Sequence, residues 1–237
     1  MLCALNPEEL VPAEHALRGI KALTDRALGD MDDELEAMYA SHGRPSVPPE
    51  RLLKSMLLMA LYSIRSDRQF CEQLRYNLLY RWFLDMEMTD AVWDRTTFSH
   101  NRERLLEHDV ARVLFGMVVE QAREQKLTSS EHFSVDGTLI EAWASMKSFR
   151  PKDSDDDGPD NNGWSDFRGT KRRNETHESK TDPVRKRIEE IFGSMKTIGG
   201  LRRTRFKGRR RTELHALLVG TAYNLLRIAK LQPALAN

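Results

Sequence analysis

The stretch PPERLLKSMLLMALYSI, residues 48–64, decides the fold class. Its two leading prolines suit the first turn of a helix, where a missing backbone N–H costs nothing. The residues that follow are apolar on nearly every face of a helical projection: Leu52, Leu53, Met56, Leu57, Leu58 and Leu61. A helix that is hydrophobic all round must be covered on all sides. The stretch therefore predicts a central, buried helix with a helical domain around it.

Neighbouring segments supply further helices for that domain. One helix is predicted to open near Pro12, a second after the N-cap residues Ser66 and Asp67, and others near Asp94 and Val110. Their apolar positions recur at helical spacing: Leu17, Ile20, Leu23 and Leu28, then Phe70, Leu74 and Leu78, then Val113, Leu114, Met117 and Val118. The aromatic-rich run 76–88 is interpreted as core packing rather than as a surface for base stacking. These patterns predict a helical domain over residues 1–128.

Composition sets limits on the class of protein. The 237 residues are 40% hydrophobic and 31% charged, and the net charge of +1 says nothing about partners. The two cysteines, Cys3 and Cys71, have no metal-binding spacing, so a cytoplasmic location is expected. No apolar run reaches the roughly 20 residues of a membrane span, and no basic-then-apolar leader opens the chain. We therefore expect no membrane association.

The middle of the chain has a different character. The run HFSVDGTLIEAWAS, residues 132–145, resembles one strand that carries a carboxylate, Asp136. We expect one or a few short strands near residues 132–140, within a strand region 129–145. Residues 146–184 contain almost no large aliphatic side chains and five aspartates between 153 and 160. Such a segment cannot bury enough apolar area to offset the entropy of ordering it, which predicts a disordered polar insert.

A second helical region, residues 185–231, follows the insert. In VRKRIEEIFGSMKTIGGLRRTRF, residues 184–206, a helical projection places Arg185, Glu189 and Lys196 together on one flank. That flank borders an apolar stripe made of Ile188, Ile191, Phe192 and Met195, while Glu190 points toward solvent. Gly199 and Gly200 end the helix. An ordinary amphipathic helix with i, i+4 ion pairs remains the alternative to a functional site.

The local charge of this region favours a nucleic-acid partner. Residues 185–211 hold eleven Lys or Arg and two acids, a local charge of about +9 that the aspartates of the insert hide. Cations that neutralise phosphates release counterions, which drives binding to nucleic acid. Thr212 is predicted to cap a last helix with one apolar face: Leu214, Leu217, Leu218, Thr221, Leu225 and Ile228. We expect that face to pack on the helical domain or on the strand near Asp136.

These residues resemble insertion-sequence transposases of the DDE type. GRPSVPPERLLKSMLLMALYSIRSDRQFCEQLRYNLLYRWF and DRTTFSHNRERLLE are similar to the helical N-terminal domain of that family. HFSVDGTLIEAWASMKSFRPKD is similar to the first catalytic strand. RKRIEEIFGSMKTIGGLRRTRFKGRRR is similar to the closing catalytic helix, in which Arg, Glu and Lys follow at fixed spacing. The resemblance covers most of the chain.

The resemblance implies a site and a cofactor. Asp136 and Glu189 would be catalytic carboxylates that ligate a divalent metal, Mg²⁺ or Mn²⁺. Arg185 and Lys196 would contact DNA. In the family, a second aspartate ends another strand in a longer intervening region. Here Asp136 and Glu189 are 53 positions apart, and none of the aspartates between them follows an apolar strand.

The expected fold is therefore mainly α: a helical N-terminal domain plus a truncated RNase H-like α/β remnant with a disordered polar insert. We expect a transposase-family protein that binds duplex DNA at terminal inverted repeats and is catalytically defective. The alternatives are an active metal-dependent strand transferase, a DNA-binding regulator, or an inert gene fragment. A homo-oligomer and a hetero-oligomer with full-length transposase are both left open.

The expected DNA-binding residues form two groups. Besides Arg185 and Lys196, the basic run contributes Arg202, Arg203, Arg205 and Lys207, and the helical domain contributes Arg102 and Arg104. A helix-turn-helix-like interpretation of residues 66–105 has polar side chains exposed on its later helix: Thr96, Thr97, Asn101, Arg102 and Arg104. The alternative is a helical packing domain with dimerising surfaces.

Overall fold

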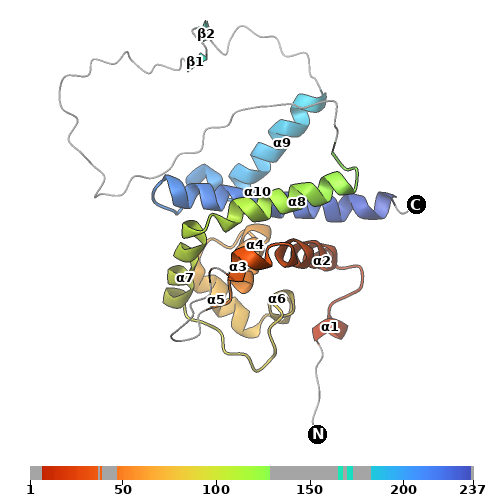
Figure 1. Cartoon of the computed structure of the whole chain (residues 1–237), viewed down its shortest axis with the longest axis vertical. Coiled ribbons are helices and arrows are strands. Elements are labelled where there is room, and N and C mark those ends of the chain that lie inside the picture. The colour runs from red at the N-terminus through yellow and green to blue at the C-terminus, as the bar shows by residue number, and fades with distance from the viewer. Residues whose placement is uncertain are drawn as a thin grey trace, which may run out of the picture.

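The computed structural model describes residues 7–36, 38, 47–128, 165–167, 170–172 and 183–235, with side chains described for residues 7–36, 38, 47–128 and 190–232. The fold is mainly α, as predicted (Figure 1). The N-terminal helices are α1 (Pro7–Leu10), α2 (Ala16–Gly29), α3 (Asp32–Glu36), α4 (Pro49–Leu61), α5 (Asp67–Tyr76), α6 (Leu78–Phe83), α7 (Arg95–Glu107) and α8 (Val110–Glu124). The later elements are β1 (Ser165–Phe167), β2 (Thr170–Arg172), α9 (Pro183–Thr197), the 3₁₀ turn η2 (Leu201–Arg203) and α10 (Arg209–Leu235). No helix in the described ranges is both long and apolar enough to cross a membrane.

Helix α4 lies at the centre of the helical core, as its sequence predicts. Pro49 occupies the first helical turn, and Leu52, Leu53, Leu57 and Leu58 have no exposed surface. Even Lys54 is buried, because it forms ion pairs with Asp25 of α2 and with Asp85 after α6. A buried ammonium requires such partners. The ion pairs therefore fix α4 against α2 and α6 in one register.

Side-chain caps set the start of several helices. The Ser66 hydroxyl accepts a hydrogen bond from Gln69 N at 3.3 Å, and the Asp94 carboxylate accepts from Thr96 N at 2.7 Å and Thr97 N at 3.1 Å. The cap at Ser66 and the helix start at Asp94 agree with the sequence prediction, whereas Asp67 is the first residue of α5 and not its cap. The helix after Ser66 ends before Leu78, however, because Asn77 is extended and its side chain caps α6. Leu78 therefore begins a new helix instead of continuing α5.

The middle of the aromatic-rich run is part of the core, as predicted, whereas its two ends, Tyr76 and Met88, are exposed. Tyr80, Trp82 and Phe83 are buried. Phe70 stacks on Tyr80 with ring centroids 6.1 Å apart and lies 5.7 Å from Phe98. Offset and tilted contacts of this kind are favourable beyond the area that they bury. The rings thus join α5, α6 and α7 into one layer.

A buried arginine holds the loop after α6. Arg81 is 5% exposed, and its guanidinium donates to three backbone carbonyls, those of Leu74 at 3.1 Å, Glu87 and Asp90 at 3.1 Å. Replacing Arg81 with alanine would leave these carbonyls without the charged donor. Hydrogen bonds to a charged group contribute roughly 1.5–3 kcal/mol each, and their effects are not additive.

We expect Arg81→Ala to lower the free energy of unfolding by about 3 kcal/mol, because three backbone acceptors, one buried and two part-buried, lose one charged donor. Urea unfolding followed by circular dichroism measures the change, with an unaltered m-value. Arg75→Ala, at an exposed position of α5, is the control and is expected to shift stability by less than about 0.5 kcal/mol. A loss below about 1 kcal/mol for Arg81→Ala would show that the loop does not depend on this side chain.

The last helix completes the core of the helical domain. Helix α10 packs along α8 and also against α4 and α2 (Figure 1). Its buried positions include Leu214, Leu218, Ala222, Leu225 and Ile228. At the crossing with α2, a Cβ added to Gly19 would lie 3.2 Å from the Cβ of Ala229, so the two helices approach closely. The expectation that α10 packs on the N-terminal helices is confirmed.

The start of α10 differs from the prediction. The helix begins at Arg209, so the prediction that Thr212 caps it is wrong. Gly208 has a positive φ of 87°, a conformation that suits glycine and separates α10 from the preceding turn. The Thr212 hydroxyl instead donates to the carbonyl of Gly208 at 3.0 Å, four residues back. This is the bond that a threonine inside a helix makes.

The strand content described is small. β1 and β2 pair in antiparallel fashion, with Ser165 opposite Arg172 and Phe167 opposite Thr170. This hairpin lies inside the segment for which the sequence predicts disorder, and it holds an aromatic and a β-branched residue that favour strands. The strand predicted near residues 132–140 lies outside the described residues. An RNase H-like remnant therefore stays a prediction.

Candidate nucleic-acid interface

Residues 198–211, called the basic segment here, connect α9 to α10 across the end of α4. Gly199 and Gly200 allow the turn into it. A Cβ on Gly199 would lie 2.3 Å from Val219 Cγ1, and Gly200 has a φ of 69°. The segment is attached to the helical domain at once, because Ser63 Oγ donates to the carbonyl of Ile198 at 3.0 Å. Arg65 donates to the carbonyl of Arg203 a few residues further on.

A carboxylate of α5 binds two arginines beside the basic segment. Asp67 accepts hydrogen bonds from Arg102 of α7 at 2.8 and 2.9 Å, from Ser99 Oγ at 3.0 Å, and from Arg205 of the basic segment. Burial by itself would raise the pKa of Asp67, but the two guanidinium groups outweigh it, and the pKa lies below its ordinary value. The carboxylate is therefore ionised and joins α5, α7 and the basic segment.

Phe206 is the apolar anchor of the same cluster. Phe206 is 6% exposed, and the guanidinium carbons of Arg102 and Arg205 lie 4.9 and 4.6 Å from its ring centroid. His215 of α10 meets the ring edge-on at 5.0 Å. Cation–π contacts at these distances are attractive, and more so when water is excluded. Asp67, Arg102, Arg205 and Phe206 are called the Asp67 cluster below.

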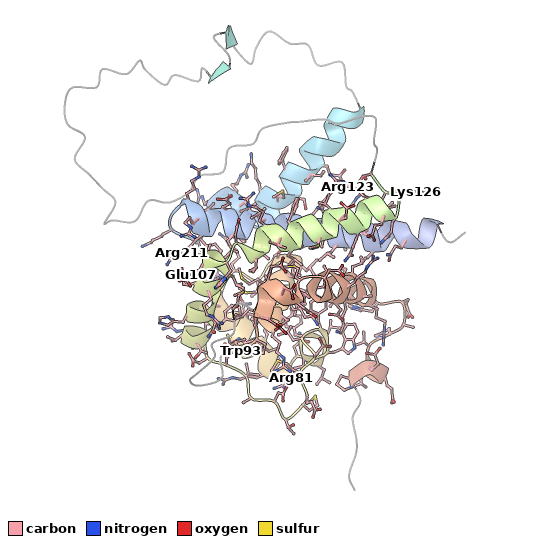
Figure 2. All side chains as sticks on the ribbon, in the orientation of Figure 1. Arg81, Trp93, Glu107, Arg123, Lys126 and Arg211 are labelled. Carbon is pink, nitrogen blue, oxygen red and sulfur yellow. The ribbon has the colours of Figure 1, made fainter. Side chains whose placement is uncertain are left out.

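The remaining cations of the basic segment face solvent. Arg202, Arg203 and Lys207 are exposed, and none of them pairs with a carboxylate among the described side chains. Arg209 of the segment is exposed as well, whereas its last two cations are engaged, since Arg210 donates to the carbonyl of Leu106 and Arg211 pairs with Glu103 at 3.0 Å. Figure 2 shows Arg211 near Glu107, at the opposite end of α8 from Arg123 and Lys126. The surface thus presents unpaired cations on a segment that is firmly attached.

The predicted residues of α7 do not all lie on the surface. Thr96 and Thr97 are exposed, as expected. The prediction that Asn101 and Arg102 are exposed is wrong, because Asn101 is buried and Arg102 is 8% exposed. The reason is Asp67, whose carboxylate compensates the buried guanidinium. Arg104 is half-buried and donates to Asn101 Oδ1 at 3.2 Å.

The pair α5 and α7 also differs from a simple helix-turn-helix. Helix α6 lies between them in sequence, and α7 packs against α4 and α8 as well as α5. A recognition helix needs several side chains that reach base edges. Two of the five positions expected to do so are instead part of the interior. This part of the chain has the character of a helical packing domain.

The candidate catalytic residues are placed only in part. Asp136 lies outside the described residues, while Glu189 and Arg185 belong to α9 at positions whose side chains are not described. Lys196 is half-buried and Glu190 is exposed, as the projection predicts for Glu190. Among the side chains that the structure describes, no group of three His, Cys, Asp or Glu could hold a metal ion. The fit of Mg²⁺ or Mn²⁺ to Asp136 and Glu189 therefore rests on the sequence alone.

A cavity lies beside Glu190, the residue that follows Glu189. A cavity of about 250 Å³ between α8, α9 and α10 is lined by Thr128, from which the chain continues toward Asp136, and by Glu190, which follows Glu189. Leu127, Ile191 and Tyr223 add apolar walls. The cavity thus lies between α8 and the two helices α9 and α10.

His215 is a buried titratable residue beside the Asp67 cluster that the sequence patterns did not single out. Its Nδ1 is buried and has no hydrogen-bond partner among the described residues. Burial, and then the nearby charges of Arg205, Arg65 and Arg102, lower its pKa from 6.5 to about 4. The ring is therefore neutral at pH 7. Asp67 was likewise recognised only as a helix cap, and Phe206 only as a residue within the basic run.

We expect stability to fall as the pH drops from 6.5 toward 4, because the unfolded chain takes up the His215 proton before the folded chain does. At pH 4.5 the loss is about 2 kcal/mol relative to pH 7. Urea unfolding at both pH values, on the wild type and His215→Gln, measures it. The pKa of Asp67 is lowered by Arg102 and Arg205, which keeps this carboxylate ionised to lower pH than an ordinary aspartate. An equal pH dependence in both proteins would contradict the assignment.

Together these features define a mainly α protein with an exposed cationic face of the kind that neutralises phosphates. Two family models match the chain: the transposase domain DUF772 over residues 5–104 and the transposase DDE domain over residues 161–229. The chain belongs to the insertion-sequence DDE transposases, as its motifs predict. No solved structure matches it. The family implies the use of a divalent metal.

Proposed function

We propose that this transposase-family chain binds duplex DNA at the terminal inverted repeats of its element through the basic segment, and that it does not cut DNA by itself. The observation that carries the binding proposal is the exposure of Arg202, Arg203 and Lys207 on a segment anchored to the helical core. Phosphate contacts of this kind position a protein on DNA without reading its sequence. Such a chain acts as a competitor for transposon ends.

The catalytic part of the proposal rests on the spacing of the acids. Two-metal chemistry requires carboxylates that converge on ions about 3.5–4 Å apart. Asp136 and Glu189 are separated by 53 positions, and the strands described between them are three residues each. A sheet that supports a third carboxylate needs more strands than this. We therefore infer that Asp136 and Glu189 correspond to two of the family's metal ligands, and that this chain does not supply the third carboxylate.

Binding is tested by fluorescence anisotropy with a labelled terminal-repeat duplex and an unrelated duplex. We expect saturable binding at about 50 mM salt, weakened roughly 40-fold at about 200 mM salt if three phosphates are neutralised. The unrelated duplex is expected to bind with the same salt dependence. No binding at the lower salt concentration would overturn the proposal.

The alternative, an active strand transferase, is tested separately with a nicking assay. The wild type and Asp136→Ala are incubated with terminal-repeat DNA and Mg²⁺ or Mn²⁺. We expect no nicking by either protein. Metal-dependent nicking by the wild type, lost in Asp136→Ala, would show that the chain assembles a working site.

A further inference from the structure

We propose that Asp67 is a positioning residue for DNA binding, which fixes the basic segment so that its exposed cations face the duplex. This inference rests on the proposed DNA-binding function. Asp67 itself is shielded, with 13% of its side chain exposed, and it points at Arg102 and Arg205 rather than at solvent. Its role is therefore to hold other residues and not to contact DNA.

The contacts explain how one carboxylate can fix the segment. Arg102 approaches Asp67 from α7, and Arg205 approaches it from the basic segment. The same two guanidinium groups also contact the ring of Phe206. The carboxylate neutralises two neighbouring cations that would otherwise repel each other. Without Asp67, both cations would remain half-buried or buried with no counter-charge, and the segment would be pushed away from α7.

Release of the segment would weaken binding even though its cations remain. The exposed Arg203 lies two residues before Arg205, and Lys207 directly follows Phe206. A segment that is already ordered does not have to lose conformational entropy when it binds, whereas a released segment does. This ordering cost does not depend on salt. The salt dependence of the affinity therefore distinguishes the two roles. Loss of a positioning residue leaves the slope of log K against log salt unchanged, whereas loss of a phosphate contact reduces it.

The direction of the effect discriminates between two explanations. Asp67 is an acid beside a proposed DNA-binding face. On charge alone, its removal would raise the affinity for DNA, because a repulsive charge disappears and two arginines are freed. If Asp67 positions the segment, its removal lowers the affinity instead. The two explanations therefore predict opposite signs for the same variant.

The test compares Asp67→Asn with Glu72→Gln, a matched loss of one negative charge at an exposed position of the same helix. We expect the Kd of Asp67→Asn for the labelled duplex to rise about 10-fold at every salt concentration, with an unchanged slope of log K against log salt. Glu72→Gln is expected to bind as the wild type does or slightly more tightly. Asp67→Glu, which keeps the charge, is expected to recover most of the affinity. Unchanged or tighter binding by Asp67→Asn would overturn the inference.

Arg205→Gln keeps the test decisive if Asp67→Asn is unstable, and the two changes form a double-mutant cycle if Asp67→Asn folds. Arg205→Gln removes the cluster from the side of the basic segment and leaves the helical core intact. We expect Arg205→Gln to weaken binding with an unchanged salt slope, and to add little to Asp67→Asn when both are present. A reduced slope, with additive effects, would show that Arg205 contacts phosphate directly.

Failure of the proposed function is distinguishable from failure of this inference. If the wild type does not bind duplex DNA at low salt, the proposed function fails, and this inference fails with it. If the wild type binds and Asp67→Asn binds equally well, only the positioning role fails. Hydrogen exchange of residues 201–208 in Asp67→Asn gives a readout without DNA, and exchange as slow as in the wild type would also overturn the role.

Discussion

Replacing Arg202, Arg203 and Lys207 together with glutamine is expected to lower the affinity for a short duplex on the order of 100-fold at about 100 mM salt. Each neutralised phosphate contributes about 0.9 to the slope of log K against log salt, so the slope should fall by about 2.7. The three side chains are exposed and carry no described structural contact through their charged groups. The expected stability is therefore close to that of the wild type.

A matched control separates location from total charge. Arg123, Arg227 and Lys230 are exposed cations near the far ends of α8 and α10, and Figure 2 shows Arg123 well away from Arg211. Their replacement with glutamine removes the same three charges. We expect this control to change the affinity by only a few fold, through the long-range field alone. Equal losses in the two triple variants would show that net charge, and not the basic segment, governs binding.

Removing α10 is expected to abolish cooperative unfolding of the helical domain. Complete burial of a Leu or Ile side chain contributes about 1.5–3 kcal/mol. Leu214, Leu218, Leu225 and Ile228 of α10 are all at most 4% exposed, so their sum is on the order of 10 kcal/mol. That is comparable to the whole stability of a domain, about 5–15 kcal/mol. A chain that ends at residue 208 should give a broad thermal transition with reduced helicity.

Point variants in α10 refine this result where the shortened chain aggregates. Leu225→Ala, at a position with no exposed surface, is expected to cost about 2–5 kcal/mol. Leu231→Ala, at a position that is 36% exposed, should cost much less. A sharp, wild-type-like melting transition for the shortened chain would show that the N-terminal helices form a complete core without α10.

The packing of α10 shows how the two family segments of this chain share one core. The transposase domain DUF772 match ends at residue 104, and the DDE domain match runs to residue 229. Helix α10 belongs to the second match, yet its apolar face packs on α2 and α4 of the first. The basic segment is carried with α10 and so becomes part of the helical surface.

Local rules were sufficient to predict most helices. Three kinds of local signal were enough: the all-apolar pattern of α4, the helix starts at Ser66 and Asp94, and the apolar stripe of α2. Each depends on residues within a few positions of one another. The wrong start predicted for α10 also has a local cause. Gly208, with its positive φ, ends the preceding turn, so the helix begins at Arg209 and not after Thr212. Helical periodicity thus specifies elements well and their first residues less well.

The candidate interface could be predicted only as a charge, not as a structure. Asp67 and Arg205 are 138 positions apart, and no spacing rule joins the first residue of α5 to an arginine in a distant basic run. Arg102 is predicted as a surface cation because the sequence does not reveal its partner. In the fold it pairs with Asp67, 35 positions away, and this ion pair allows its burial. Two of the predicted DNA contacts, Arg102 and Arg205, thereby become candidates for positioning roles. Arg202, Arg203 and Lys207 are exposed, and they stay predicted DNA contacts on the basis of the charge pattern.

The most direct test of the proposed interface is photo-crosslinking of the intact chain to a duplex with photoreactive bases, followed by mass spectrometry of the linked peptides. The proposed interface predicts cross-links within residues 198–211 and in the adjoining turn that holds Arg65. Cross-links should disappear at high salt, because phosphate neutralisation drives the contact. Cross-links confined to α1, α2 and α6, or none at low salt, would contradict DNA binding through the basic segment.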